Sequence, residues 1–238
     1  MSVDVVAVGA HPDDVELGIG GLVCKLAQRG RRVGILDLSR GEMSTRGSVD
    51  ERVEEAAEAA RILGVTRRDN AELPDGTLAN TDDQRRRVIQ WIRTLRPQML
   101  LVPMEGDRHP DHGAAYHLVR DANYFSGLVQ IDTGQRPHRT PWVYYYHPYY
   151  DGATSPQILI DVSEQFETKL AALKAHKSQF YNPEYPGEAT LISSEAFWDS
   201  IRVRAAYWGT RIHAAYGEPL HAEGPIGLEF PPGLEPRP

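Results

Sequence analysis

Apolar residues follow two alternating patterns along this chain, short β-branched runs and longer stretches with a helical period. The first run, residues 3–8, ends at Gly9 and is typical of a buried strand. Further strands are expected at Arg32–Leu38, around Asn70–Asn80 and at Met99–Pro103. Amphipathic helices are expected at Gly20–Arg29, Asp50–Leu63, Asp82–Leu95 and His112–Gly127. This alternation predicts a Rossmann-like α/β fold, a doubly wound, mostly parallel sheet with helices on both faces.

The pattern changes after about residue 130, which predicts a C-terminal strand and helix extension. Strands are expected at Pro141–Tyr149 and Gln157–Asp161, and helices at Ser163–Lys177 and Ser194–Trp208. Ser163 is the expected N-cap of its helix. No linker is long enough to divide the chain, so a single domain is expected over residues 1–238. Residues 229–238 are expected to be an extended or disordered tail.

Polar side chains follow two of the predicted strands at the point where each strand ends. The segment AHPDD, residues 10–14, follows the first strand, and HPDH, residues 109–112, follows the strand at Met99–Pro103. The carboxyl ends of neighbouring parallel strands meet at the sheet edge where ligands bind, so these two segments are expected to face each other. A dinucleotide site is disfavoured, because Asp13, Asp14 and Glu16 would repel its phosphates and the glycines at 18, 20 and 21 lack G-x-G-x-x-G spacing.

Imidazole and carboxylate groups gathered in one place indicate a divalent metal site. A single aspartate before a helix is commonly only an N-cap. One cap accounts for Asp13 or Asp14, but it leaves the other aspartate and His11 without a role. The second histidine-containing segment repeats the pattern, so the sequence favours a metal site at this edge.

Composition restricts the class of partner. The chain has 238 residues, 41% of them hydrophobic, enough for a sizeable core. Its net charge of −7 argues against nucleic acid or an anionic membrane as the main partner. With Cys24 as the sole cysteine no intrachain disulfide can form, and no apolar run approaches the length of a membrane span. A soluble, cytoplasmic protein is therefore expected.

Several segments resemble one known enzyme family. They are AHPDD (Ala10–Asp14), DLSRGE (Asp37–Glu42), ERVEEAAEAARILGV (Glu51–Val65), HPDH (His109–His112) and Tyr216-x-Glu218. Together they resemble the zinc-dependent N-acetylglucosaminyl deacetylases of the PIG-L or LmbE-like family. Within this family the chain looks most similar to the deacetylases of bacillithiol biosynthesis, which act on N-acetylglucosaminyl-malate.

The resemblance implies a role for each residue of the two segments. His11, Asp14 and His112 match the family's metal ligands, which implies one Zn²⁺ per chain, with Fe²⁺ as an alternative. Asp13 is left free to accept a proton from water, and His109 is the candidate acid for the departing amine. Asp111 is expected to hold the protonated form of His109. A homo-oligomer, either a trimer or a hexamer, is a further implication of the resemblance.

Two arginines suggest an anionic substrate. Arg52 lies in the first turn of its predicted helix, where a cation is unfavourable, and Arg108 lies beside the second polar segment. Neither has an evident structural task, and arginine binds carboxylates in a bidentate manner, so both are expected to contact the malate. A neutral substrate such as diacetylchitobiose is the alternative. Phe197 occupies the position where some family members have an oxyanion-binding tyrosine, and His147 is a possible further ligand.

Three other functions remain open at this point. Two Asp/His segments could hold the two metals of a phosphoesterase, although only Asp13 is available as a bridging carboxylate. Two histidines and one aspartate also suit the Fe(II) of a non-haem oxygenase. A non-enzymatic, metal-containing sugar-binding module is the third alternative, and it would have no need of a free carboxylate at Asp13.

Overall fold

The computed structural model describes residues 2–149 and 155–227, which contain one seven-stranded sheet. The strands are β1 (Val5–Gly9), β2 (Val33–Asp37), β3 (Arg67–Asn70), β4 (Met99–Pro103), β5 (Trp142–Tyr146), β6 (Ile158–Asp161) and β7 (Gly217–Ala222). Their order is β3-β2-β1-β4-β5-β7-β6, with every pair from β3 to β5 parallel and the two pairs made by β7 antiparallel. The predicted tail at residues 229–238 lies outside the described residues.

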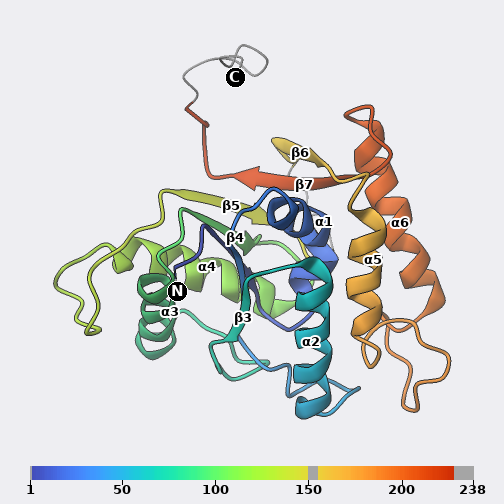
Figure 1. Cartoon of the computed structure of the whole chain (residues 1–238). Helices are drawn as coiled ribbons and strands as arrows, with labels where there is room; N and C mark the ends of the chain where they lie inside the picture. Colours follow the sequence, from blue (N-terminus) through green and yellow to red (C-terminus); the bar gives the residue numbers. More distant parts are fainter. Residues whose placement is uncertain (1, 150–154, 228–238) are drawn as a thin grey trace.

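Helices cover both faces of the sheet (Figure 1). The helices are α1 (Asp14–Gln28), α2 (Val49–Leu63), α3 (Asp82–Leu95), α4 (Pro110–Ser126), α5 (Phe166–Ala175) and α6 (Glu195–Thr210). Successive side chains of β1 point to opposite faces of the sheet, which divides the core in two. Val6 and Val8 pack with α3 and α4, whereas Val5 and Ala7 pack with α1, α2 and α5. The predicted α/β fold, with a mostly parallel sheet between two helical layers, is confirmed. None of the described helices is long and apolar enough to span a bilayer.

Helix α1 begins at Asp14, ahead of the expected start at Gly20. Three other elements also differ from the sequence expectation. β7 was not expected, because its sequence GEPLHA carries Glu218 and His221, although both are buried. Helix α5 begins at Phe166 rather than at Ser163, whose hydroxyl donates to Asp161 instead of capping the helix. The third strand is the charged segment 67–70, and residues 71–80 form the connection that follows it.

The buried face of α2 is rotated from its apolar stripe. The stripe of Val53, Ala56, Ala57, Ala60 and Leu63 predicts Val53 as buried, yet Val53 is 55% exposed. Arg52 and Glu55 are buried instead. Glu55 accepts hydrogen bonds from the backbone N–H and the hydroxyl of Ser178, each at 2.7 Å. Polar partners outside the helix therefore decide which of its faces is buried, and they direct Arg52 inward.

Candidate active site

A cavity of about 380 Å³ opens at the carboxyl ends of β1 and β4. Its lining includes residues of both polar segments, namely His11, Asp13, Asp14, His109 and His112. These residues lie at helix starts, because Asp14 begins α1 and His109 is the N-cap of α4. The register of β1 with β4, Ala7 opposite Leu101, brings the two starts together. The structure thus gathers residues that are about a hundred positions apart in the chain.

The Asp14 carboxylate lies between two imidazoles. Its Oδ1 is 3.1 Å from Nε2 of His112, and its Oδ2 is 3.5 Å from Nδ1 of His11. The backbone N–H of His11 also donates to Asp14 Oδ2 at 2.9 Å, which fixes the carboxylate. Asp14 and His112 are both buried. The Asp14 carboxylate therefore contacts both His11 and His112, one through each oxygen.

The donor chemistry fits a transition-metal ion. Two imidazoles with one carboxylate are a ligand set that both Zn²⁺ and Fe²⁺ accept. Among the described residues, one group with ligand atoms within 4.8 Å of one another is His11, His109 and His112, so His109 takes the place that the sequence gives to Asp14. Among the described residues a second group with this spacing contains His11, Asp75 and Asp111. Because both groups include His11, they cannot both be filled independently.

His109 combines a structural contact with a position beside the metal-binding region. Its Nδ1 accepts the backbone N–H of Asp111 at 3.2 Å, so the imidazole itself caps α4. Its ring stacks on His112 at 5.0 Å and meets His11 edge-on at 4.6 Å between ring centroids. Burial and the neighbouring histidine charges lower the pKa of His109. His109 also lines the cavity.

The Asp13 carboxylate, unlike that of Asp14, does not contact His11 or His112. Burial raises the pKa of Asp13 to about 6, although the positive charge of Arg52 opposes this. Its backbone φ of 144° is one that residues with a side chain rarely adopt. A raised pKa and a strained backbone are both typical of a functional carboxylate.

Arg52 has structural partners that the sequence analysis did not anticipate. Its guanidinium donates to the carbonyl oxygens of Gly41 and Pro12, each at 2.9 Å, and lies 3.4 Å from Asp13 Oδ2. The expectation that Arg52 lacks a structural task is therefore wrong. The rotation of α2 directs Arg52 inward, although a cation near a helix start is unfavourable. Two carbonyl oxygens and one carboxylate oxygen stabilise its charge there.

Asp111 contacts a different histidine from the one expected. Its Oδ2 lies 3.3 Å from Nε2 of His11 and accepts the N–H of Gly76 at 2.8 Å. The expected pairing of its carboxylate with His109 is corrected accordingly. Asp111 is the second residue of α4, so its carboxylate extends toward the loop before α3 while its backbone N–H meets His109.

The other sequence candidates lie at the margin of the cavity or outside it. Arg108 is exposed and lines the cavity. Phe197 also lines it and packs on Tyr149, with 4.3 Å between ring centroids, so it contributes an apolar surface and no hydroxyl. His147 is buried edge-on against His221 and belongs to neither of the ligand groups found in the described residues.

Two aspartates at the site were missed by the sequence analysis. Asp75 Oδ1 lies 3.0 Å from His11 Nε2, and its Oδ2 accepts the N–H of Met43. Burial alone would raise the pKa of Asp75, but its hydrogen bonds, of which the one from His11 has the largest effect, lower the pKa to about 2. Asp107 Oδ1 is 3.0 Å from His112 Nδ1, although that contact lacks hydrogen-bond geometry. Asp75 lies in a Pro-Asp-Gly turn, where aspartate is common for local reasons. Asp107 precedes HPDH by two residues, and that proximity was the available signal.

Comparison with known proteins places the chain in a family. Residues 6–123 match the family model PIG-L, described as GlcNAc-PI de-N-acetylase. The diacetylchitobiose deacetylase of Thermococcus kodakarensis is 31% identical over 97% of this chain and 84% of that protein. A probable N-acetyl-α-D-glucosaminyl L-malate deacetylase 2 of Bacillus anthracis is 30% identical over 74% of this chain and 81% of that protein.

A solved structure agrees with this assignment. The conserved protein TT1542 of Thermus thermophilus superposes with a TM-score of 0.86 and 35% sequence identity, covering 95% of this chain and 97% of that one. Fold, sequence and the two polar segments therefore lead to one conclusion: the chain belongs to the PIG-L (LmbE-like) deacetylase family.

Proposed function

We propose that this protein removes the acetyl group from an N-acetylglucosamine conjugate by metal-dependent amide hydrolysis. The observation that carries the proposal is that the adjacent carboxylates of Asp13 and Asp14 have different neighbours. Asp14 contacts both His11 and His112, whereas Asp13 lies in the same cavity with Arg52 as its charged neighbour. A sugar-binding module has no use for that second carboxylate.

One metal ion per chain is part of the proposal. His11, Asp14 and His112 would hold Zn²⁺, or alternatively Fe²⁺, and the bound ion activates water and polarises the acetyl carbonyl. The two possible ligand groups among the described residues, His11/His109/His112 and His11/Asp75/Asp111, share His11, which supports a single ion rather than the pair that a phosphoesterase needs. Elemental analysis of metal-loaded protein tests this, and two equivalents per chain would overturn it.

The protein's own groups carry the protons. Asp13 accepts a proton from the attacking water as the new C–O bond forms at the acetyl carbon. His109 delivers a proton to the amide nitrogen as the C–N bond breaks, and acetate and a free amine result. Asp75 and Asp111 both approach His11 Nε2, which orients that ring.

The deciding experiment measures acetate release from a panel of N-acetylglucosaminyl conjugates. Metal-loaded wild type is compared with chelator-treated protein and with Asp13→Asn. Acetate release that needs both the metal and Asp13 supports the proposal. Binding of the sugar without any release would favour the sugar-binding module, and turnover of a phosphate ester instead would favour the phosphoesterase.

We propose a neutral aglycone, such as the second sugar of diacetylchitobiose, as the first candidate. The malate expectation rested on the resemblance to the bacillithiol deacetylases and on two arginines, but Arg52, although it lines the cavity, is buried with partners of its own. Arg108 alone supports malate, because it is exposed beside the cavity. N-acetylglucosaminyl-malate of bacillithiol biosynthesis is therefore the second candidate.

The assembly and the location of the protein stay predictions. The resemblance to the family implies a trimer or a hexamer. Sedimentation of the purified chain tests this, and a monomer at working concentration would contradict it. A cytoplasmic location is tested by fractionation of cells that express the protein.

A further inference from the structure

Helix α1 is bent close to the active site. Ile19 has φ −138° and ψ 23°, which are not helical angles, so α1 consists of a first turn at residues 14–18 and a second segment that restarts at Gly20. The first turn begins with Asp14, and Asp13 precedes it. The orientation of this turn relative to the sheet therefore sets where both carboxylates point.

The first turn is held against β5 by a glycine. A Cβ on Gly18 would lie 2.3 Å from Cδ2 of Tyr146, so no larger residue fits without displacing that ring. The Tyr146 hydroxyl donates to the carbonyl of Val8 at 2.7 Å, which fixes the ring to the end of β1. The turn thus rests on a rigid surface on this side.

The second segment is held by Glu218 of β7. The first N–H groups of a restarted helix have no carbonyl acceptor within that helix. Glu218 Oε1 accepts from Gly21 N at 2.9 Å, and its Oε2 accepts from Leu22 N at 2.7 Å. The carboxylate therefore acts as an N-cap that is supplied from the far end of the chain, with a charge that suits the helix dipole.

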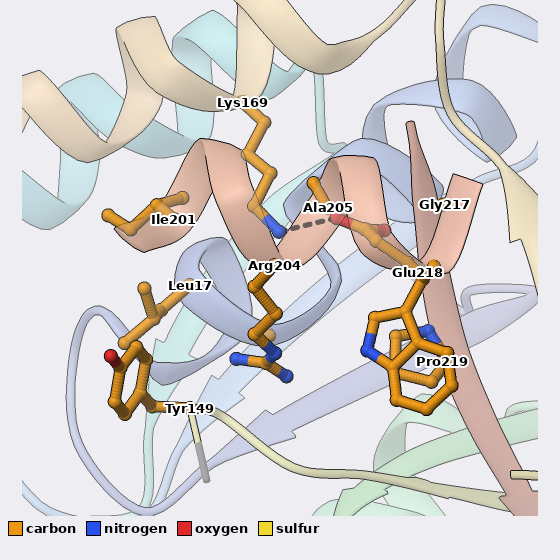
Figure 2. A pocket seen from close by; sticks show the side chains of 11 residues that line it. Leu17, Tyr149, Lys169, Ile201, Arg204, Ala205, Gly217, Glu218 and Pro219 are labelled. Atoms are coloured by element: carbon orange, nitrogen blue, oxygen red, sulfur yellow. Dashed lines mark hydrogen bonds and ion pairs between the residues drawn. The ribbon is translucent and has the colours of Figure 1, made fainter. Parts of the chain in front are cut away.

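Lys169 of α5 completes this arrangement. Its Nζ lies 2.6 Å from Glu218 Oε1, and the two residues are 3% and 1% exposed. Figure 2 shows the lysine and the glutamate extending toward each other from α5 and β7. A Cβ on Gly20 would lie 3.2 Å from Lys169 Cγ, so the lysine stem packs directly on the restarted helix. A buried carboxylate is costly without such a partner.

We propose that Glu218, held in place by Lys169, is a positioning residue for the metal site. By capping the second segment it fixes the bend at Ile19, and the bend sets the orientation of the turn that carries Asp14. Glu218 touches neither the three site histidines nor the cavity that they line; it acts through α1. This inference rests on the proposed function, in which Asp14 is a metal ligand.

The test compares metal affinity in three variants of the full chain. Glu218→Gln keeps the side-chain shape but presents an amide N–H₂ to one of the two helix N–H donors. Lys169→Met keeps the stem on Gly20 and removes the charge. Arg93→Met is the matched control, because Arg93 is equally buried and donates to the carbonyls of Ser126 and Leu128, away from α1. The readouts are Zn²⁺ affinity of the metal-free protein against a competing chelator, the denaturation midpoint, and separate kcat and KM values.

The proposal predicts a specific combination of results. Glu218→Gln should weaken Zn²⁺ binding about 10-fold, the lower end of the effect of residues that orient metal ligands, and should reduce kcat with little change in KM. Lys169→Met should show a smaller loss of the same kind. Arg93→Met should lower the denaturation midpoint and leave Zn²⁺ affinity unchanged.

Contrary results are equally clear. Unchanged Zn²⁺ affinity in a folded Glu218→Gln protein overturns the proposal, as does an equal loss in Arg93→Met, which would indicate general destabilisation. If Glu218→Gln does not fold, unchanged affinity in Lys169→Met is the overturning result. Zn²⁺ binding is measured without substrate, so a wild type that binds the metal but releases no acetate overturns the proposed function and leaves this comparison intact.

Discussion

The guanidinium of Arg52 lies 3.4 Å from the carboxylate of Asp13, and both side chains are buried. The same guanidinium donates hydrogen bonds to the carbonyl oxygens of Pro12 and Gly41, so it connects the segment before α1 to the loop after β2. One cation thus supports the backbone around Asp13 and partly offsets the effect of burial on its pKa. A structural role and a substrate-binding role for Arg52 make different predictions.

Arg52→Ala is expected to destabilise the protein even in the absence of substrate. Removing one partner of a buried ion pair typically costs about 3–5 kcal/mol, because a charge is left without compensation. The free energy of unfolding, measured in urea, should fall by an amount of this order. A variant of wild-type stability whose only defect is a raised KM would instead assign Arg52 to substrate binding.

Asp13→Asn is expected to retain the metal and to lose most of the activity. The amide has nearly the same shape but cannot accept a proton, and general-base catalysis is typically worth about 10²–10⁴-fold in rate. Metal content and kcat are measured on the same preparation, and loss of the metal would show that Asp13 and Asp14 have exchanged roles.

Asp111→Asn is expected to weaken metal binding. Its carboxylate approaches His11 Nε2 at 3.3 Å, as does that of Asp75 at 3.0 Å, and such partners hold the tautomer and orientation of a ligating imidazole. Asp111→Asn and Asp75→Asn should each raise the metal dissociation constant about 10-fold, and the variant that combines them should raise it further. Normal metal affinity in Asp111→Asn combined with a lost pH dependence of kcat would restore its expected role beside His109.

The sequence was informative where local patterns determine structure. The apolar period places β1, β2, β4 and the helices between them, and Pro-Asp segments after two strands locate the site, because parallel strands end at one edge. β7 could not be predicted in this way, since Glu218 and His221 interrupt any apolar alternation. The partners of Glu218 are Lys169 of α5 and two N–H groups of α1, which are tertiary contacts.

The partners of charged residues were the least predictable part of the site. The sequence shows no partner for Arg52, because its acceptors, Gly41 and Pro12, lie outside its helix. The sequence favours His109, two residues before Asp111, as its partner, whereas the fold brings His11 to it from a hundred residues away. Local sequence identifies chemical groups, but the fold determines which of them meet.

The buried Tyr145 is expected to make the protein sensitive to alkaline pH. Burial and the neighbouring Glu223 raise the pKa of its hydroxyl. Above about pH 10 the unfolded chain loses this proton before the folded protein does, so the free energy of unfolding falls by about 1.4 kcal/mol per pH unit for each such group. Tyr145→Phe should flatten the decline between about pH 10 and 11, measured by urea denaturation. Tyr124→Phe, at a tyrosine that is 56% exposed, is the control, and an equal change there would contradict the assignment.

Arg108 offers the clearest test of the aglycone. It is exposed at the cavity, so an ion pair with a malate carboxylate would be screened by water and worth about 1 kcal/mol, or roughly fivefold in affinity. Since a neutral aglycone is the first candidate, wild type is expected to hydrolyse diacetylchitobiose with a higher kcat/KM than N-acetylglucosaminyl-malate. Arg108→Ala should lower kcat/KM for the malate conjugate by about that factor and leave the neutral sugar unaffected. If wild type prefers the malate conjugate and Arg108→Ala abolishes the preference, the order of the two candidates is reversed. An equal loss of kcat/KM on both substrates would assign Arg108 a role in catalysis or in the fold. The loss of an anion-binding group by itself would not slow the turnover of a neutral sugar.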